Sequence, residues 1–435
     1  MNEPLFLGLG RTIITPSVGC NLSGYAPDVI STSLHDDLTA TAFYFRQGDT
    51  HVMMVSVTVC SILKSTCDHI RALIEAECGV PRECCIIHAI HTHSGPICNA
   101  GYGWGKADPE YQRNVFIPRI LEAAKTAAAS QIPVTMKIST GESLVGINRR
   151  ELRIDNKIVL GQNPWGPFDP KMTVITFADE DGKPLANIVH YGCHGTASGK
   201  NHEISRDWAG VMIDALEEYS GAVTAFFNGP EGDVGPRLAN GKTTGAQHVK
   251  YAVEHGGMAA CDAIRIYRER NGYVTPKLSV SSEELSIPLL PRIPEAVARE
   301  LYKEFEGQTV NLKGRKRVYY ENVLKSYADG YVEEKAVTVE QIVIRLGDLA
   351  IIALPFELFS EIGMRIAGAS PFAHTLTLSN TNANSGYLVT EDQICRGGYE
   401  VDMFQTRGLQ PYVPNADFHL ITQTIKHLNK MNEGE

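Results

Sequence analysis

Three histidines stand close together where a short apolar run ends. His88, His91 and His93 follow Cys84 to Ile87, which is typical of a buried strand, and Gly95-Pro96 ends any extended structure. Side chains two residues apart in a strand share a face, so we expect His91 and His93 to point the same way. Such a pair binds a metal ion, or one ring binds it while the other moves protons. The competing interpretation is a set of hydrogen-bonded core histidines, which the sequence His-x-His-Ser-Gly-Pro makes less favourable.

Polar side chains also come directly after other predicted strands. His194, Glu357 and Tyr387 each follow an apolar, β-branched run. Open α/β sheets place their ligands at such strand ends. Two imidazoles and a carboxylate are a frequent ligand set for a catalytic zinc ion. By spacing alone, four more side chains are equally open candidates: His190, His202, Asp207 and Asp233.

The elements that must position these residues alternate between strands and helices. A strand at 51–59, a helix at Ser65–Glu77 and a strand at 84–90 predict a βαβ unit whose second strand leads to His91. The first strand, from Leu5, is predicted at a sheet edge because Pro16 follows it. Further helices are predicted at 109–130, 208–219, 247–270 and 416–431. We expect one α/β domain over 1–435, with a charged helical excursion at about 295–335 on its surface.

Composition limits the class of protein. The 435 residues are 43% hydrophobic and 21% charged, as in ordinary globular proteins, and a net charge of −10 argues against nucleic acid as a partner. No stretch approaches the ~18 apolar residues of a membrane span, and no export signal is visible at the N-terminus. The ten cysteines are irregularly spaced, which indicates reduced thiols. We therefore expect a cytoplasmic protein without stable membrane association; a homo-oligomer is compatible with this.

Several short motifs, taken in order, resemble the catalytic domain of neutral/alkaline non-lysosomal ceramidases. The resemblance extends from about residue 6 to about residue 405, and the first histidine block is its most specific part. Its motifs are His91-Thr-His-Ser-Gly-Pro96, Ile147-Asn-Arg149, Val189 to Thr196, Gly232-Asp-Val-Gly-Pro236, Pro355-Phe-Glu357, Tyr387-Leu-Val-Thr390 and Tyr399-Glu400. The fold that this implies is α/β: a mixed β-sheet core with flanking helices and a zinc site at the strand ends.

The resemblance also implies roles for individual residues. Zn²⁺ would be the cofactor, held by four ligands: His91, His194, Glu357 and Tyr387. Three catalytic residues would surround the scissile amide: His93, Arg149 and Tyr399. Each has a simpler explanation when taken alone. Glu357 could be a carboxylate at a helix N-terminus, the tyrosines could be packing residues and Arg149 could pair with a surface acid.

Two departures from the family pattern bear on the substrate. Gly235 stands where the family has a serine, and the chain leaves no room for the family's C-terminal immunoglobulin-like domain. We therefore expect a zinc-dependent amidohydrolase that acts on a soluble small-molecule N-acyl substrate. The alternatives are a true ceramidase, a non-catalytic binding homologue, and a zinc esterase or lyase. With the net charge of −10, an anionic substrate would need local help, from Arg149 or Arg396.

Overall fold

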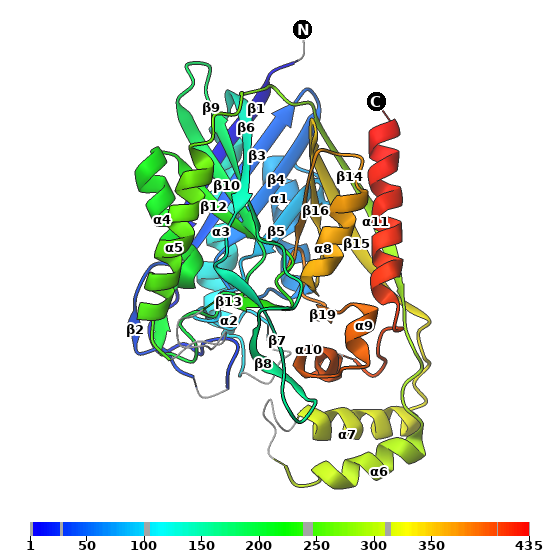
Figure 1. Cartoon of the computed structure of the whole chain (residues 1–435). Helices are drawn as coiled ribbons and strands as arrows, with labels where there is room; N and C mark the ends of the chain where they lie inside the picture. The colour runs from blue at the N-terminus through cyan, green and yellow to red at the C-terminus, as the bar shows by residue number, and fades with distance from the viewer. Residues whose placement is uncertain are drawn as a thin grey trace.

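Eight strands form the larger of two main sheets. The computed structural model describes residues 3–26, 29–99, 105–237, 247–308, 315–406 and 408–434. The strand order is β12-β10-β9-β6-β1-β3-β4-β5, mostly antiparallel, with parallel pairs β10/β12 and β4/β5 (Figure 1). The bounds are β1 Leu5–Ile13, β3 Thr39–Gln47, β4 Thr50–Val57, β5 Cys85–Ala89, β6 Ile132–Glu142, β9 Lys171–Ala178, β10 Pro184–Tyr191 and β12 Val223–Asn228.

The first strand is not at an edge. β1 pairs with β3 over eight residues and with β6 over three, so it lies in the middle of the sheet, and the predicted edge position is wrong. Pro16 does not conflict with this, because it follows the end of the strand at Ile13 and removes no ladder hydrogen bond. The predicted βαβ unit is confirmed: α1 (Lys64–Cys78) connects the parallel strands β4 and β5.

A second sheet faces the first. Its order is β14-β15-β16-β18, with bounds Leu278–Pro288, Ala336–Leu346, Leu349–Ala353 and His374–Leu378. Alternate residues of both sheets form one buried cluster, which includes Phe45 of β3, Phe177 of β9 and Ile344 of β15. Alternation sends the intervening side chains to the opposite faces, which the helices cover. The architecture is therefore mixed sheets with flanking helices, as the resemblance implied.

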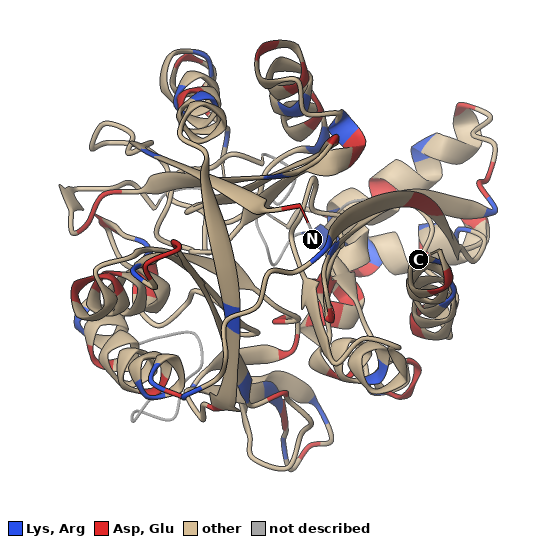
Figure 2. Cartoon of the chain, turned by 90° about the horizontal axis from the view of Figure 1, so that it is seen from above, with Lys and Arg blue, Asp and Glu red and all other residues tan. Residues whose placement is uncertain are grey.

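Helices flank the two sheets on both outer sides (Figures 1 and 2). Their bounds are α3 Ile117–Ala129, α4 Asp207–Ser220, α5 Lys250–Tyr267, α8 Ser360–Ala369 and α11 Ala416–Glu433. The predicted helix at 109–130 is interrupted: α2 (Pro109–Tyr111) leads through a π-helical turn, Gln112–Phe116, into α3. Pro118 has no N–H to donate to residue 114, and this missing bond favours the wider turn.

The charged excursion consists of two helices, α6 (Glu295–Phe305) and α7 (Arg315–Ala328). They pack on each other through a small apolar cluster that includes Ala298, Tyr319 and Val323, and they lie at one end of the molecule in Figure 1. No helix in the described ranges combines the length and apolar character that a membrane span requires.

Several short strands lie at the end of the sheets that is nearer to α6 and α7 (Figure 1), and they were not predicted from the sequence. A three-stranded sheet contains β13 (Val234–Pro236), β7 (Gly146–Leu152) and β8 (Ile158–Asn163). Two-residue strands β17 (Glu357–Leu358) and β19 (Tyr387–Leu388) pair in parallel, as do β2 (Ser33–Leu34) and β11 (Glu203–Ile204). These strands are too short or too polar for apolar alternation to reveal them.

Candidate metal centre

The histidine motif is brought together by a turn and not by a strand. β5 ends at Ala89, and His91 has a left-handed backbone with φ +71°. The prediction that His91 and His93 share the face of a strand is therefore wrong in its geometry. The two rings still meet, with 3.2 Å between their Nε2 atoms, because the His91 N–H donates to Val59 O and the His93 N–H donates to Gly195 O.

His194 reaches the same place from the end of β10. Gly195 makes this possible, because a Cβ there would lie 2.7 Å from the carbonyl oxygen of His91. The imidazoles of His91 and His194 stand edge to face, with ring centroids 4.7 Å apart. Both side chains are almost completely buried. Two strand ends far apart in the sequence thus deliver two imidazoles to one point.

Glu357 and Tyr387 come from the second half of the chain. β17 and β19 set them directly opposite each other in the parallel pair. Glu357 Oε1 accepts a hydrogen bond from Asn384, while Oε2 lies 3.5 Å from Nε2 of His91 and 3.5 Å from Nε2 of His194. The Tyr387 hydroxyl is 3.5 Å from His194 Nε2. All four residues predicted as ligands therefore meet in one cluster, in which His91, His194 and Glu357 are buried and Tyr387 is partly buried.

The tautomers of the two imidazoles suit a metal ion. His91 Nδ1 is 2.8 Å from Cys60 O, and His194 Nδ1 is 2.7 Å from Glu231 O. A carbonyl oxygen only accepts, so each Nδ1 carries the proton and each Nε2 presents a lone pair. Glu357 Oε2 is buried and accepts no hydrogen bond within the described ranges. Two imidazole nitrogens and an anionic oxygen fit a divalent cation such as Zn²⁺.

The pKa shifts of the candidate ligands also favour the binding of a cation. Burial lowers the pKa of His194 to about 3, with Arg149 lowering it further, so the ring is neutral at neutral pH. Burial acts to raise the pKa of the Glu357 carboxyl, but His91 and His194 outweigh it and hold that pKa well below its usual value. A neutral imidazole at His194 and an ionised carboxylate at Glu357 are the protonation states that bind a cation.

A second grouping of potential ligands involves Cys60, His91 and His93. Burial raises the pKa of the Cys60 thiol well above its usual value, and the charge of Glu357 raises it further. A thiol must lose its proton to bind zinc. Its sulfur also lies 3.8 Å from His91 Nδ1, the nitrogen already bonded to the Cys60 carbonyl. The set of His91, His194 and Glu357 is therefore the better candidate.

Arg149 is held between the cluster and a buried acid. Its Nη2 donates to the Tyr387 hydroxyl at 3.0 Å, and its Nε donates to Glu400 at 2.9 Å. Arg150 donates to the other oxygen of Glu400 at 2.6 Å, and all three charged side chains are buried. Burial and the charge of Glu357 raise the pKa of the Tyr387 phenol well above its usual value, while the guanidinium of Arg149 acts in the opposite direction, toward the anionic form that could bind a cation. The simpler explanation of Arg149, a pair with a surface acid, is wrong.

Tyr399 lies against the same group, with its ring centroid 5.9 Å from that of Tyr387 and 5.9 Å from the guanidinium carbon of Arg149. No role for Glu400 or Arg150 was predicted from the sequence. The adjacent arginines are flanked by Asn148 and Glu151, so their sequence context does not predict burial, and only the buried position of both cations reveals the need for a buried anion.

The other four open candidates lie apart from this cluster or have structural roles. His190 Nε2 is bonded to Thr377 O, and His202 is exposed. Asp207 accepts hydrogen bonds from the backbone of Ala197 and Ser198. Asp233 accepts from Asn148 and the Ser360 N–H. Each of these side chains has a hydrogen-bonding function that requires no metal ion.

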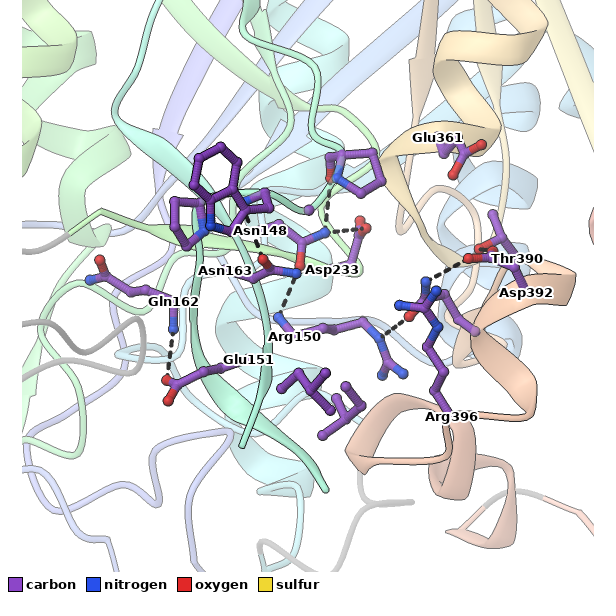
Figure 3. Close-up of a pocket in the computed structure, with 17 residues that line it drawn as sticks. Asn148, Arg150, Glu151, Gln162, Asn163, Asp233, Glu361, Thr390, Asp392 and Arg396 are labelled. Atoms are coloured by element: carbon purple, nitrogen blue, oxygen red, sulfur yellow. Dashed lines mark hydrogen bonds between the residues drawn. The ribbon is translucent and has the colours of Figure 1, made fainter. Parts of the chain in front are cut away.

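A cavity of about 620 Å³ borders the small sheet (Figure 3). Arg150, Asn148 and Asp233 line it together with Arg396, whereas the described residues predicted as metal ligands do not. Figure 3 shows Asn148 directed at Asp233 and Arg396 on the opposite wall. Arg396, considered above for anionic substrates, thus faces this cavity and not the metal centre.

Comparison with known proteins places the chain in a family. A sequence model described as neutral/alkaline non-lysosomal ceramidase, N-terminal, matches residues 5–261. The chain belongs to this family. The matched region contains His91, His93, Arg149 and His194, while Glu357, Tyr387 and Tyr399 lie beyond it.

Individual ceramidases also match this chain, in sequence and in structure. Neutral ceramidase B of Dictyostelium discoideum is 30% identical over 256 residues, 53% of this chain and 35% of that protein. The neutral ceramidase of Pseudomonas aeruginosa is 25% identical over 252 residues, 54% of this chain and 37% of that protein. Its crystal structure superimposes with a TM-score of 0.77 and 19% identity, covering all of this chain and 75% of that chain. The sequence matches thus span little more than a third of these ceramidases, and the structural match shows that the fold is shared.

Proposed function

We propose that the chain is a zinc-dependent hydrolase that cleaves a linear N-acyl amide bond, preferentially in a soluble N-acyl compound. The observation that carries the proposal is the close approach of three buried atoms, each of a type that binds a cation: His91 Nε2, His194 Nε2 and Glu357 Oε2. When bound, zinc supplies Lewis acidity, which polarises a carbonyl and activates water at neutral pH. Membership of the ceramidase family supports amide hydrolysis as the reaction class.

His93 is the residue proposed to carry protons. Burial lowers its pKa well below the usual value, with His91 and His194 adding to the effect, so its ring is neutral at neutral pH, which is the form that a general base requires. In the proposed reaction His93 takes one proton from water and delivers it to the leaving amine, while the C–N bond breaks and the acyl group becomes a carboxylic acid. Arg149 and Tyr399 lie on the Tyr387 side, where they can stabilise charge on the carbonyl oxygen.

The preference for a soluble substrate rests on Gly235. Gly235 pairs with Ile147 in the small sheet, and Ile147 is two residues before Arg149. Gly235 also follows Val234, whose carbonyl accepts a hydrogen bond from the His194 N–H. A family residue with a hydroxyl at this place is therefore missing beside the candidate metal centre. The names of the relatives favour ceramide, and the missing hydroxyl favours either another substrate or a binding protein without turnover.

Metal analysis and kinetics together test the proposal. We expect about one zinc per chain, loss of activity with a chelator and recovery on adding zinc. We expect a higher kcat/KM on N-acyl amino acids than on a solubilised short-chain ceramide. Absence of zinc would contradict the hydrolase assignment and favour the binding protein. Efficient ceramide cleavage with no turnover of N-acyl amino acids or esters would contradict the substrate assignment alone.

A further inference from the structure

Tyr25 has a buried hydroxyl with no hydrogen-bond partner in the part of the chain that the structure describes. A buried hydroxyl without a partner destabilises the folded state, since it gives up its hydrogen bonds to water and gains none. Each such group in a native protein calls for an explanation, such as an ordered water, stored strain or a functional role. For this hydroxyl, a position beside the candidate metal centre favours the functional role.

The segment that carries Tyr25 is fixed to the histidine motif. Leu22 bridges to Pro96, and Ser23 bonds to Gly95 through its N–H at 3.0 Å and to Pro96 through its hydroxyl at 3.1 Å. Gly24 has φ +104°, and a Cβ there would lie 1.9 Å from Nδ1 of His93. Only glycine allows the chain to approach the imidazole this closely. Tyr25 is therefore held directly over His93.

The ring of Tyr25 meets the ring of His93 edge to face, with centroids 5.5 Å apart. Burial raises the pKa of the Tyr25 phenol well above its usual value; Asp207, Cys60 and Tyr399 raise it further, and Arg149 lowers it. Cys60 and Arg149 contact the candidate ligands His91 and Tyr387 respectively. The raised pKa keeps the phenol protonated at neutral pH, so its hydroxyl can donate a hydrogen bond.

We propose that the Tyr25 hydroxyl hydrogen-bonds a polar group on the amine half of the substrate, such as the carboxylate of an N-acyl amino acid. This rests on the proposed function and specifies the substrate further. The ring of Tyr25 contacts His93, the group proposed to protonate the leaving amine, whereas the ring of Tyr399 contacts Tyr387. A substrate that fills this position supplies the missing partner, and one that lacks the polar group leaves the hydroxyl unsatisfied.

The test is Tyr25→Phe, which removes only the hydroxyl. Its control is Tyr111→Phe, because the Tyr111 hydroxyl is also buried but donates to Ile14 O at 2.6 Å. We expect Tyr25→Phe to keep or raise the Tm and keep the zinc, and Tyr111→Phe to lower the Tm and leave kcat/KM unchanged. A loss of Tm with Tyr25→Phe as large as with Tyr111→Phe would overturn the inference, because it would reveal a structural partner.

Two zinc-loaded assays decide the contact itself. On an N-acyl amino acid, kcat/KM should fall by roughly 10–100-fold in Tyr25→Phe, as expected for a lost hydrogen bond to a charged group. On the N-acyl alkylamine of equal chain length, which lacks the carboxylate, it should change less than about threefold. Equal losses on both substrates, or no loss, would overturn the assignment. If the wild type turns over neither substrate, the hydrolase proposal fails. The Tyr25 contact is then tested by calorimetry, which measures whether Tyr25→Phe binds the N-acyl amino acid more weakly than Tyr111→Phe does.

Discussion

Replacing Glu400 by glutamine tests how the buried charges hold the candidate site. Glu400 accepts from Arg149 at 2.9 Å and from Arg150 at 2.6 Å, and the three side chains are at most 4% exposed. The variant keeps the volume but leaves two guanidinium groups buried without a counterion. Breaking a buried ion pair in this way costs about 3–5 kcal/mol.

The expected change in melting temperature follows from chain length. An unfolding entropy of about 2.1 cal/mol/K per residue gives roughly 0.9 kcal/mol/K for the whole chain, so the Tm should fall by roughly 3–6 °C. Calorimetry on zinc-loaded protein measures this directly. The matched control is Glu300→Gln, whose partner Lys303 is 2.7 Å away but largely exposed, and its Tm should stay within about 1 °C.

Activity should respond as well, because Arg149 also contacts Tyr387. We expect kcat/KM of Glu400→Gln to fall by at least about tenfold, as for a displaced group that stabilises charge in the transition state. If Glu400→Gln melts within 1 °C of the wild type and retains full activity, the buried network does not hold Arg149, and this reasoning fails.

Three further predictions concern the same region. His194→Ala should lose both zinc and activity while remaining folded, whereas His202→Ala should lose neither; full zinc occupancy in His194→Ala would remove that residue from the ligand set. His93→Ala should retain most of its zinc and lose activity by about 10²–10⁴-fold, and loss of zinc would instead make His93 a ligand. Burial raises the pKa of Asp233 to about 7. Between about pH 4 and pH 7 the folded form therefore holds a proton that the unfolded form has released. The free energy of unfolding falls as pH rises through this range. Asp233→Asn should make the change in Tm between pH 5 and pH 8 smaller than in the wild type, and an unchanged pH dependence would show that another group is responsible.

The parts of the fold that the sequence predicted are those with strong local signals. The helix near Ser65 and the strands around it combine apolar periodicity with polar ends, and α1 (Lys64–Cys78) confirms them. The interrupted helix and the internal position of β1 were missed for different reasons. Proline chemistry at residue 118 changes one turn. The pairing partners of β1 instead lie at 39–46 and 132–134, too far along the chain for a local pattern to predict them.

The candidate site likewise has features that were predicted from the sequence and features that were not. Residue types and order, together with a family resemblance, were enough to name His91, His194, Glu357 and Tyr387, which the structure then places together. The argument from strand periodicity would not have been enough, because His91 adopts a left-handed backbone that no periodic pattern predicts.

Glu400, Arg150 and the hydroxyl of Tyr25 were found only in the tertiary structure. Their importance comes from burial: a carboxylate between two guanidinium groups and a hydroxyl without a partner are unremarkable in water and costly in a protein interior. The sequence by itself determined which groups could do chemistry and which elements carry them. Which of those groups lose contact with water is decided by packing between segments hundreds of residues apart, and so only the folded chain reveals it.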